Sequence, residues 1–158
     1  MNSFRSRLKD QRGFNLIELM IVIAIIGLLI GVGSIAWGAM IRSGNESSAT
    51  TILDRMRMYE AQYAGKNHGK FGSFDQLVQA GVIDSQFAGD APVVNGYVFR
   101  IEISEPSGST PAAYKITAEP QVPTGVTATG NRYFFTSSSI GTIKAQEGGP
   151  ATETSPSI

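Results

Sequence analysis

The sequence predicts an α+β fold in which a long N-terminal α-helix packs against a small antiparallel β-sheet. From Phe14 to about Ala64 the chain contains no proline and keeps a helical pattern of apolar residues. Beyond this helix, four short stretches rich in β-branched and aromatic residues are separated by clusters of proline, glycine, serine and threonine. With 158 residues, the chain is long enough for one such domain.

The charges are unevenly distributed along the chain. Residues 1–13 hold four basic side chains and one aspartate, whereas residues 14–158 hold nine basic and twelve acidic side chains. The formal net charge is zero, which argues against a general affinity for nucleic acid, so we expect no nucleic-acid partner. The chain has no cysteine, which excludes disulfides, thiol nucleophiles and cysteine-ligated zinc.

The basic start is followed by a long uncharged segment. Residues 19–41 contain no Asp, Glu, Lys or Arg. About 20 apolar residues span a bilayer, whereas an ordinary secretory signal has an apolar core of about 7–15 residues. Because the basic residues precede the segment and only Arg42 follows it closely, we expect a single-pass anchor in the inner membrane with a cytoplasmic N-terminus. Ser34 and Ala36 form a small-x-small pattern, which leaves an ordinary signal peptide as an alternative.

The segment Arg12–Met20 (RGFNLIELM) resembles the processing site of type IV prepilins and type II secretion pseudopilins. The resemblance implies that prepilin peptidase cuts between Gly13 and Phe14 and that Phe14 becomes the N-methylated first residue. Asn15 stands where threonine is commoner in that family. In the residues themselves, Gly13 lacks a Cβ, which allows a protease to approach an extended backbone closely.

Glu18 is the acidic residue that precedes the uncharged segment, and it lies four residues after Phe14. A carboxylate inside a bilayer costs roughly 2.5–3.5 kcal/mol, and pairing with a cation relieves this cost. The amine released by cleavage, about 6 Å away along a helix, is such a cation, on the same subunit or on a neighbour. We therefore predict that Glu18 acts in assembly; in the alternative, it extends to the headgroups. Gly27 and Gly31 form a G-x-x-x-G pattern, which predicts close helix packing.

The apolar pattern continues beyond the membrane segment. Residues spaced three and four apart predict a buried stripe on the helix: Ala49, Ile52, Leu53, Met56, Tyr59 and Tyr63. Arg42 and Glu46 have the spacing of an i,i+4 ion pair. The charged residues Asp54, Arg55, Arg57 and Glu60 are predicted to lie largely on other faces.

The remaining residues predict a globular head. After a loop at 65–72, Ser73 and Gln76 have the pattern of an N-terminal cap, which predicts a short helix that ends before Gly81. The predicted strands are Tyr97–Ser104, Tyr114–Ala118, Arg132–Thr136 and Ile140–Lys144. We divide the chain into a cleaved leader (1–13), a membrane and assembly helix (14–41), its amphipathic continuation (42–64), an α+β head (65–144) and a low-complexity tail that is disordered or loosely attached (145–158).

The sequence offers no set of residues for catalysis. His68 is the only histidine, and no partner motif accompanies it. Asp84 and Asp90 lack the spacing of a calcium loop. Asn45-Glu46-Ser47 fits a glycosylation sequon, but it lies on the predicted helix, so we read it as a chance match. We therefore expect no enzyme activity, no metal and no cofactor.

The predicted function is that of a structural subunit of a type IV pilus or pseudopilus. Its expected partners are further copies or other pilins, prepilin peptidase and the inner membrane. The precursor is expected in the inner membrane, and the assembled filament in the periplasm or at the cell surface. Two alternatives remain: a monomeric, membrane-anchored binding protein, and a secreted domain that an ordinary signal peptidase releases after Ala36.

Overall fold

The computed structural model describes residues 14–158 and divides the chain into two compact units, Met1–Ala36 and Trp37–Ile158. Gly13, the predicted cleavage residue, lies outside the described residues. Helix α1 extends over Leu16–Lys66 and belongs to both units, so each part of it is described with its own unit. The predicted α+β class is confirmed.

In the first unit, α1 is an apolar helix, and each of its residues whose burial the structure describes is exposed. The large aliphatic side chains from Leu16 to Ile30 are exposed, and so is Val32. By length and composition α1 is able to cross a membrane, and none of its most apolar 18-residue window is buried within the chain. These side chains therefore need lipid or other helices around them.

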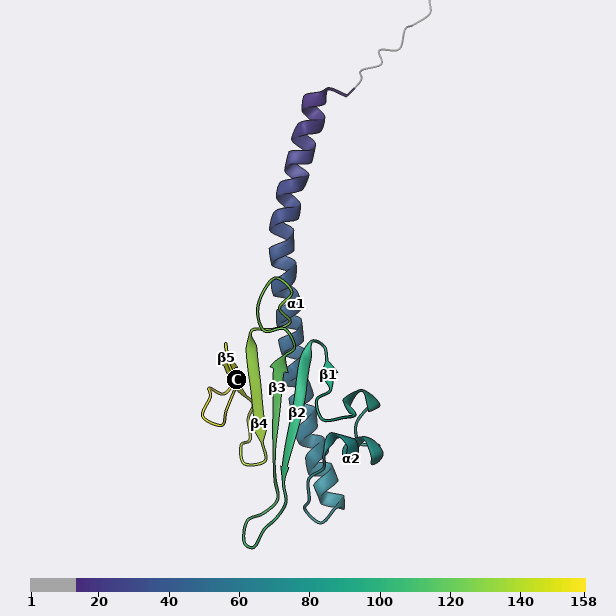
Figure 1. Ribbon diagram of the computed structural model, residues 1–158, viewed down its shortest axis with the longest axis vertical. Helices are drawn as coiled ribbons and strands as arrows, with labels where there is room; N and C mark the ends of the chain where they lie inside the picture. The colour runs from purple at the N-terminus through teal and green to yellow at the C-terminus, as the bar shows by residue number, and fades with distance from the viewer. Residues whose placement is uncertain (1–13) are drawn as a thin grey trace, which may run out of the picture. The chain divides into compact units, whose positions relative to one another are not determined.

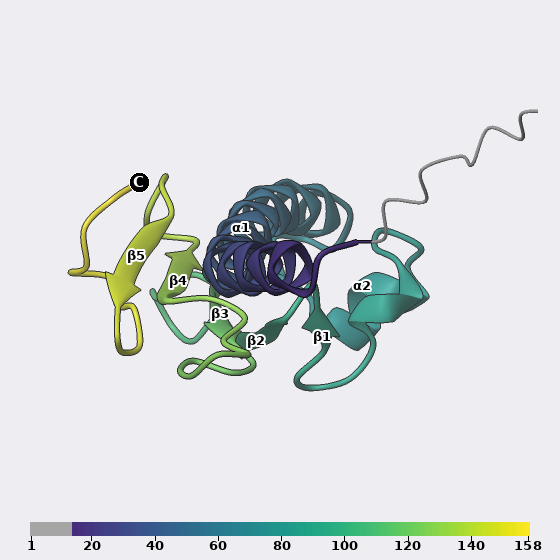
Figure 2. The ribbon, with the colours of Figure 1, turned by 90° about the horizontal axis from the view of Figure 1, so that it is seen from above.

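In the second unit, five antiparallel strands form one sheet in the order β1-β2-β3-β4-β5 (Figure 1). The strands are β1 (Val93–Val94), β2 (Tyr97–Ser104), β3 (Ala113–Pro120), β4 (Arg132–Ser137) and β5 (Lys144–Glu147). Seen from above, the sheet lies along one side of α1, with the short helix α2 (Phe74–Gln79) beyond β1 (Figure 2). A 3₁₀ turn, η1 (Ser85–Phe87), connects α2 to the sheet.

The core of this unit lies between α1, α2 and one face of the sheet. The predicted stripe on α1 supplies fully buried side chains, and the others of that stripe pack against them. The largest fully buried apolar side chains are Tyr97, Phe74, Phe99, Phe134, Leu53, Met56, Leu77 and Ile116. Burial of such a side chain contributes about 1.5–3 kcal/mol, so this layer holds the sheet to the helix.

Short-range signals predicted the local elements of the head well. Helix α2 begins with a capping box, in which Ser73 accepts from the Gln76 amide at 3.4 Å and Gln76 accepts from the Ser73 amide at 2.8 Å. Gly81 follows it with a φ of +66°, the left-handed conformation that favours glycine. The predicted strand Tyr97–Ser104 has the bounds of β2.

The last predicted strand, Ile140–Lys144, was displaced. Residues 138–143 form a turn and a bend rather than a strand, with the Ile140 amide donating to the Ser137 carbonyl at 3.3 Å, and β5 begins only at Lys144. The pattern was misleading because Ile143 is buried by the core although it precedes the strand. Strand β1 was not predicted, because two residues are too few for a periodic signal.

The prediction of a disordered C-terminal tail was also wrong. The Ala145 amide donates to the Pro156 carbonyl at 2.9 Å, and the Ile158 amide donates to the Ile143 carbonyl at 3.1 Å. Ala151 and Ser155 are buried. Low-complexity composition predicted disorder because few large apolar side chains are present, but backbone hydrogen bonds along β5 hold this segment.

Two predictions for charged residues of α1 were wrong as well. Glu46 pairs with Arg132 of β4 rather than with Arg42, because the start of β4 lies against this turn of the helix. Glu60 lies on the buried face, four residues after Met56, and is 0% exposed. The spacing was compatible with this position, but the residue type argued for the solvent side.

Candidate processing and assembly site

The first turn of α1 brings Asn15 and Glu18 together. The Asn15 side-chain oxygen accepts from the Ile17 amide at 3.3 Å, and the Glu18 carboxylate accepts from the Asn15 amide at 3.2 Å. Glu18, at the third helical position, closes back on the Asn15 amide as in a capping box, whereas the Asn15 side chain caps the second helical amide rather than the third. Asn15 and Glu18 therefore have a local role, to satisfy amides that the first turn of a helix leaves unpaired. The N-x-x-E spacing of Asn15 and Glu18 in the sequence is the signal that could have predicted this cap.

Phe14 precedes this cap and is 92% exposed. It has no helical conformation, and α1 begins two residues later at Leu16. An exposed, non-helical residue next to a helix start is accessible to a protease that binds extended backbone. The predicted role of Phe14 as the mature first residue stays a prediction.

Gly27 and Gly31 lie on the exposed part of α1. A Cβ at either position would meet no atom within 4 Å among the described residues. The fold of the single chain therefore does not require glycine at these two positions. Close packing against another helix would supply a reason for both glycines, and this packing stays a prediction.

A family model supports this reading of the N-terminus. The model described as the prokaryotic N-terminal methylation motif matches residues 8–34, which include all five predicted site residues. The chain carries the hallmark of type IV pilin and pseudopilin precursors. The motif indicates a pilin-like precursor that prepilin peptidase processes, and its family is structural rather than enzymatic. Comparison with curated proteins and with solved structures returned no match.

In the head of this pilin-like chain, two neighbouring residues of α1, Asn45 and Glu46, form hydrogen bonds to the start of β4 and to the loop before it. The Glu46 carboxylate accepts from the Asn131 amide at 2.9 Å and from Arg132 Nε at 2.8 Å, and it is 8% exposed. The Asn45 side-chain amide donates to the Thr129 carbonyl at 2.9 Å, so the nitrogen of the sequon is engaged within the head. These contacts hold the start of β4 and the loop before it against the helix.

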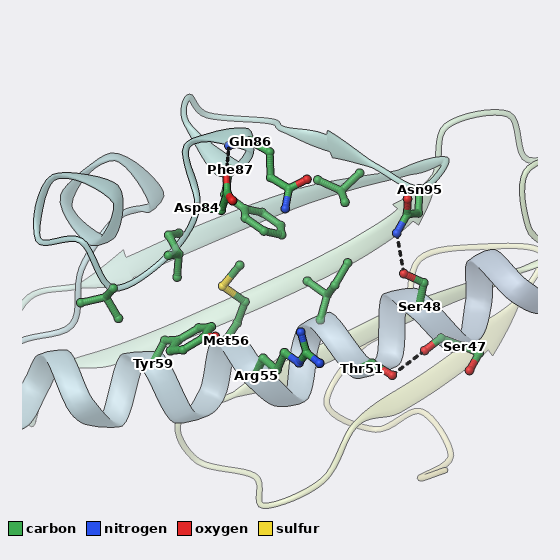
Figure 3. A pocket seen from close by; sticks show the side chains of 14 residues that line it. Ser47, Ser48, Thr51, Arg55, Met56, Tyr59, Asp84, Gln86, Phe87 and Asn95 are labelled. Atoms are coloured by element: carbon green, nitrogen blue, oxygen red, sulfur yellow. Dashed lines mark hydrogen bonds between the residues drawn. The ribbon is translucent and has the colours of Figure 1, made fainter.

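A groove of about 520 Å³ lies between α1 and the segment that contains η1 and β1 (Figure 3). Met56 and Phe87 point toward each other at its apolar floor, and the Asn95 side-chain amide donates to Ser48 Oγ at 2.7 Å at its edge. Its charged lining residues are Arg55 and Asp84. The lining residues of this groove include neither histidine nor cysteine.

The residues considered for metal binding are not brought together. Asp84 caps η1, with its carboxylate accepting from the Gln86 amide at 3.1 Å. His68 is exposed in the loop after α1. Within residues 14–158, no group of three or more His, Cys, Asp or Glu side chains has the arrangement of a metal site.

Proposed function

We propose that this chain is a structural subunit of a type IV pilus or pseudopilus and polymerises through its N-terminal helix. The observation that carries the proposal is the methylation motif at residues 8–34, which includes the part of α1 from Leu16 to Val32 whose large apolar side chains are exposed in the single chain. Lipid covers such side chains in the precursor, and neighbouring helices cover them in a filament.

In this proposal, prepilin peptidase cuts between Gly13 and Phe14, and the new amine of Phe14 is methylated. The cut removes the four basic side chains that precede the span. It also creates a cation close to Glu18, whose carboxylate in the precursor accepts from the Asn15 amide at 3.2 Å. A charge-assisted hydrogen bond is roughly twice as strong as a neutral one, so the amine of an adjacent subunit competes well for this carboxylate.

The local capping role of Glu18 must be separated from the proposed role in assembly. Glutamine can replace glutamate at the third position of a capping box, but it carries no charge. The variant Glu18→Gln should therefore keep the start of α1 and leader cleavage, yet lose most of its filament yield. The exposed Glu102→Gln in β2 is the matched control.

The experiment compares sheared filaments by electron microscopy, and processed against unprocessed subunit by immunoblot. Wild type and Glu102→Gln should give equal filament yields, whereas Glu18→Gln should give processed subunit without filaments. A normal filament yield from Glu18→Gln would show that the carboxylate charge is not needed for assembly.

The proposed partners are other copies of this chain or other pilins, prepilin peptidase and the inner membrane. The precursor spans the inner membrane once, and the polymer lies in the periplasm or on the cell surface. Microscopy of surface fibres distinguishes a pilus from a periplasmic pseudopilus.

A further inference from the structure

Glu60 is a fully enclosed carboxylate with incomplete hydrogen bonding. Its Oε2 accepts from the Gly72 amide at 3.0 Å, and its Oε1 has no hydrogen-bond partner among the described residues. An ionised carboxylate in such a place has lost its hydration without full compensation. Burial raises the pKa of Glu60 to about 7, although the hydrogen bond from Gly72 acts in the opposite direction.

The neighbouring charged groups do not neutralise Glu60. Arg57, one turn earlier on α1, donates hydrogen bonds to Asp54 Oδ1 at 3.1 Å and to the Gly141 carbonyl at 2.7 Å. Tyr114 of β3 lies close by, and burial is the main cause that raises the pKa of its hydroxyl.

The charged side chains of the neighbouring segments also contact groups other than Glu60. Lys70 pairs with Glu105 at 3.4 Å, and Asp75 accepts from the Gly89 amide at 2.7 Å. No ion pair found within residues 14–158 includes Glu60. The protonated form is therefore the one that this site accommodates.

Glu60 binds the end of segment 67–72, which leads from α1 toward α2, because its carboxylate accepts a hydrogen bond from the Gly72 amide. His68 and Gly69 have φ values of +56° and +81°, which reverse the chain after the helix. The Gly72 backbone is pressed against the Tyr63 ring, since a Cβ at this position would lie 3.0 Å from Tyr63 Cε1. Segment 67–72 therefore returns to α1, and its last residue meets Glu60.

The same segment covers an aromatic pair. Phe71 packs edge-on against Tyr114 of β3, with ring centroids 4.8 Å apart. Gly72 is buried, whereas Lys70 at the outer side is exposed. Opening of segment 67–72 would bring Glu60 and this aromatic pair into contact with water.

We propose that Glu60 is a proton-operated latch that keeps segment 67–72 closed against α1 when protonated and releases it when ionised. Release returns the carboxylate to water and to its ordinary pKa of 4.5. The ratio of closed to open forms therefore falls as the pH rises, by up to about 300-fold in total, because each pKa unit of difference is a factor of ten. The proposal concerns the head alone and does not depend on filament assembly.

The test is hydrogen exchange of segment 67–73 in the full chain in detergent micelles, corrected for the intrinsic pH dependence of exchange. Between pH 5.5 and 8.5, the protection of the Gly72 amide in wild type should fall about 30-fold. The Glu60→Gln variant keeps an oxygen for this amide and should show no such change. Glu102→Gln, at an exposed position of β2, should behave as wild type.

The proposal is overturned if wild-type protection is independent of pH, or if Glu60→Gln retains the same dependence. A second measurement needs no variant: the carboxyl carbon resonance of Glu60 in the wild-type chain should titrate near pH 7. A midpoint near 4.5 would overturn the latch even if Glu60→Gln failed to fold.

Discussion

The contact between Glu46 and the start of β4 gives a quantitative prediction for the stability of the head. In Glu46→Ala, the Asn131 amide loses its acceptor at 2.9 Å and Arg132 Nε loses its acceptor at 2.8 Å. A hydrogen bond to a charged group contributes about 1.5–3 kcal/mol, whereas an exposed ion pair contributes about 1 kcal/mol or less. The Arg132 side chain is 39% exposed, so the ion pair belongs nearer to the second class.

We therefore expect Glu46→Ala to lower the free energy of unfolding by about 2–3 kcal/mol, most of it from the part-buried contact between the Asn131 amide and Glu46. Glu46→Gln keeps an acceptor for that amide and should cost about half as much. The measurement is guanidinium denaturation of the full chain in micelles, followed by the near-ultraviolet circular dichroism of the head tyrosines. Glu102→Ala, in an exposed position, is the control and should change stability by less than about 0.5 kcal/mol.

A double-mutant cycle isolates the ion pair itself. Combining Glu46→Ala with Arg132→Ala should show a coupling of about 0.5–1 kcal/mol, because both side chains lose the same interaction. A loss below about 0.5 kcal/mol for Glu46→Ala alone would refute the reasoning that these contacts fasten the sheet to the helix.

Two further predictions concern the packing and pH dependence of the head. Gly130→Ala would place a Cβ against the hydroxyl of buried Tyr97, which donates to the Arg132 carbonyl at 2.8 Å. Thermal denaturation should therefore show that the free energy of unfolding falls by about 2–3 kcal/mol. The control is Gly141→Ala, where a Cβ meets nothing within 4 Å and stability should not change in this way. The pKa of Glu60 in the folded state (about 7) exceeds its ordinary value of 4.5, so between these pH values the folded state binds more protons than the unfolded state. The free energy of unfolding should therefore fall by about 3 kcal/mol as the pH rises from 4.5 to above 7. If Glu60 causes this pH dependence, it should be absent from the Glu60→Gln variant.

The sequence predicted those elements whose signals are local. Periodicity located α1 and β2, and the Ser73–Gln76 pattern located the start of α2. These signals depend on residues within one or two turns of each other, so they survive without knowledge of the rest of the fold.

The failed predictions depended on segments distant in sequence. Glu60 is buried because the chain reverses after α1 and Gly72 returns to it. The pairing of Glu46 with Arg132 joins residues 86 positions apart, and no local spacing indicates it. The ordered C-terminus follows from backbone bonds to β5, which composition does not reveal.

The methylation motif at the N-terminus was predictable because it depends on a short run of residues rather than on tertiary structure. Phe14 and Glu18 lie four residues apart, and the motif that contains them matches residues 8–34. The structure added the capping role of Asn15 and Glu18, whose hydrogen bonds lie within one chain. An assembly role of Glu18 involves a second chain and rests on the experiment with Glu18→Gln.

The most direct test of the account is mass spectrometry of the N-terminus of the mature protein from its native cell. If prepilin peptidase processes the motif, the mature chain begins at Phe14 and carries one added methyl group on its amine. A chain that begins at Met1 would indicate an uncleaved membrane anchor, and one that begins at Trp37 would indicate an ordinary signal peptide. Either of these two results would contradict a pilin-like precursor that is processed and then polymerised.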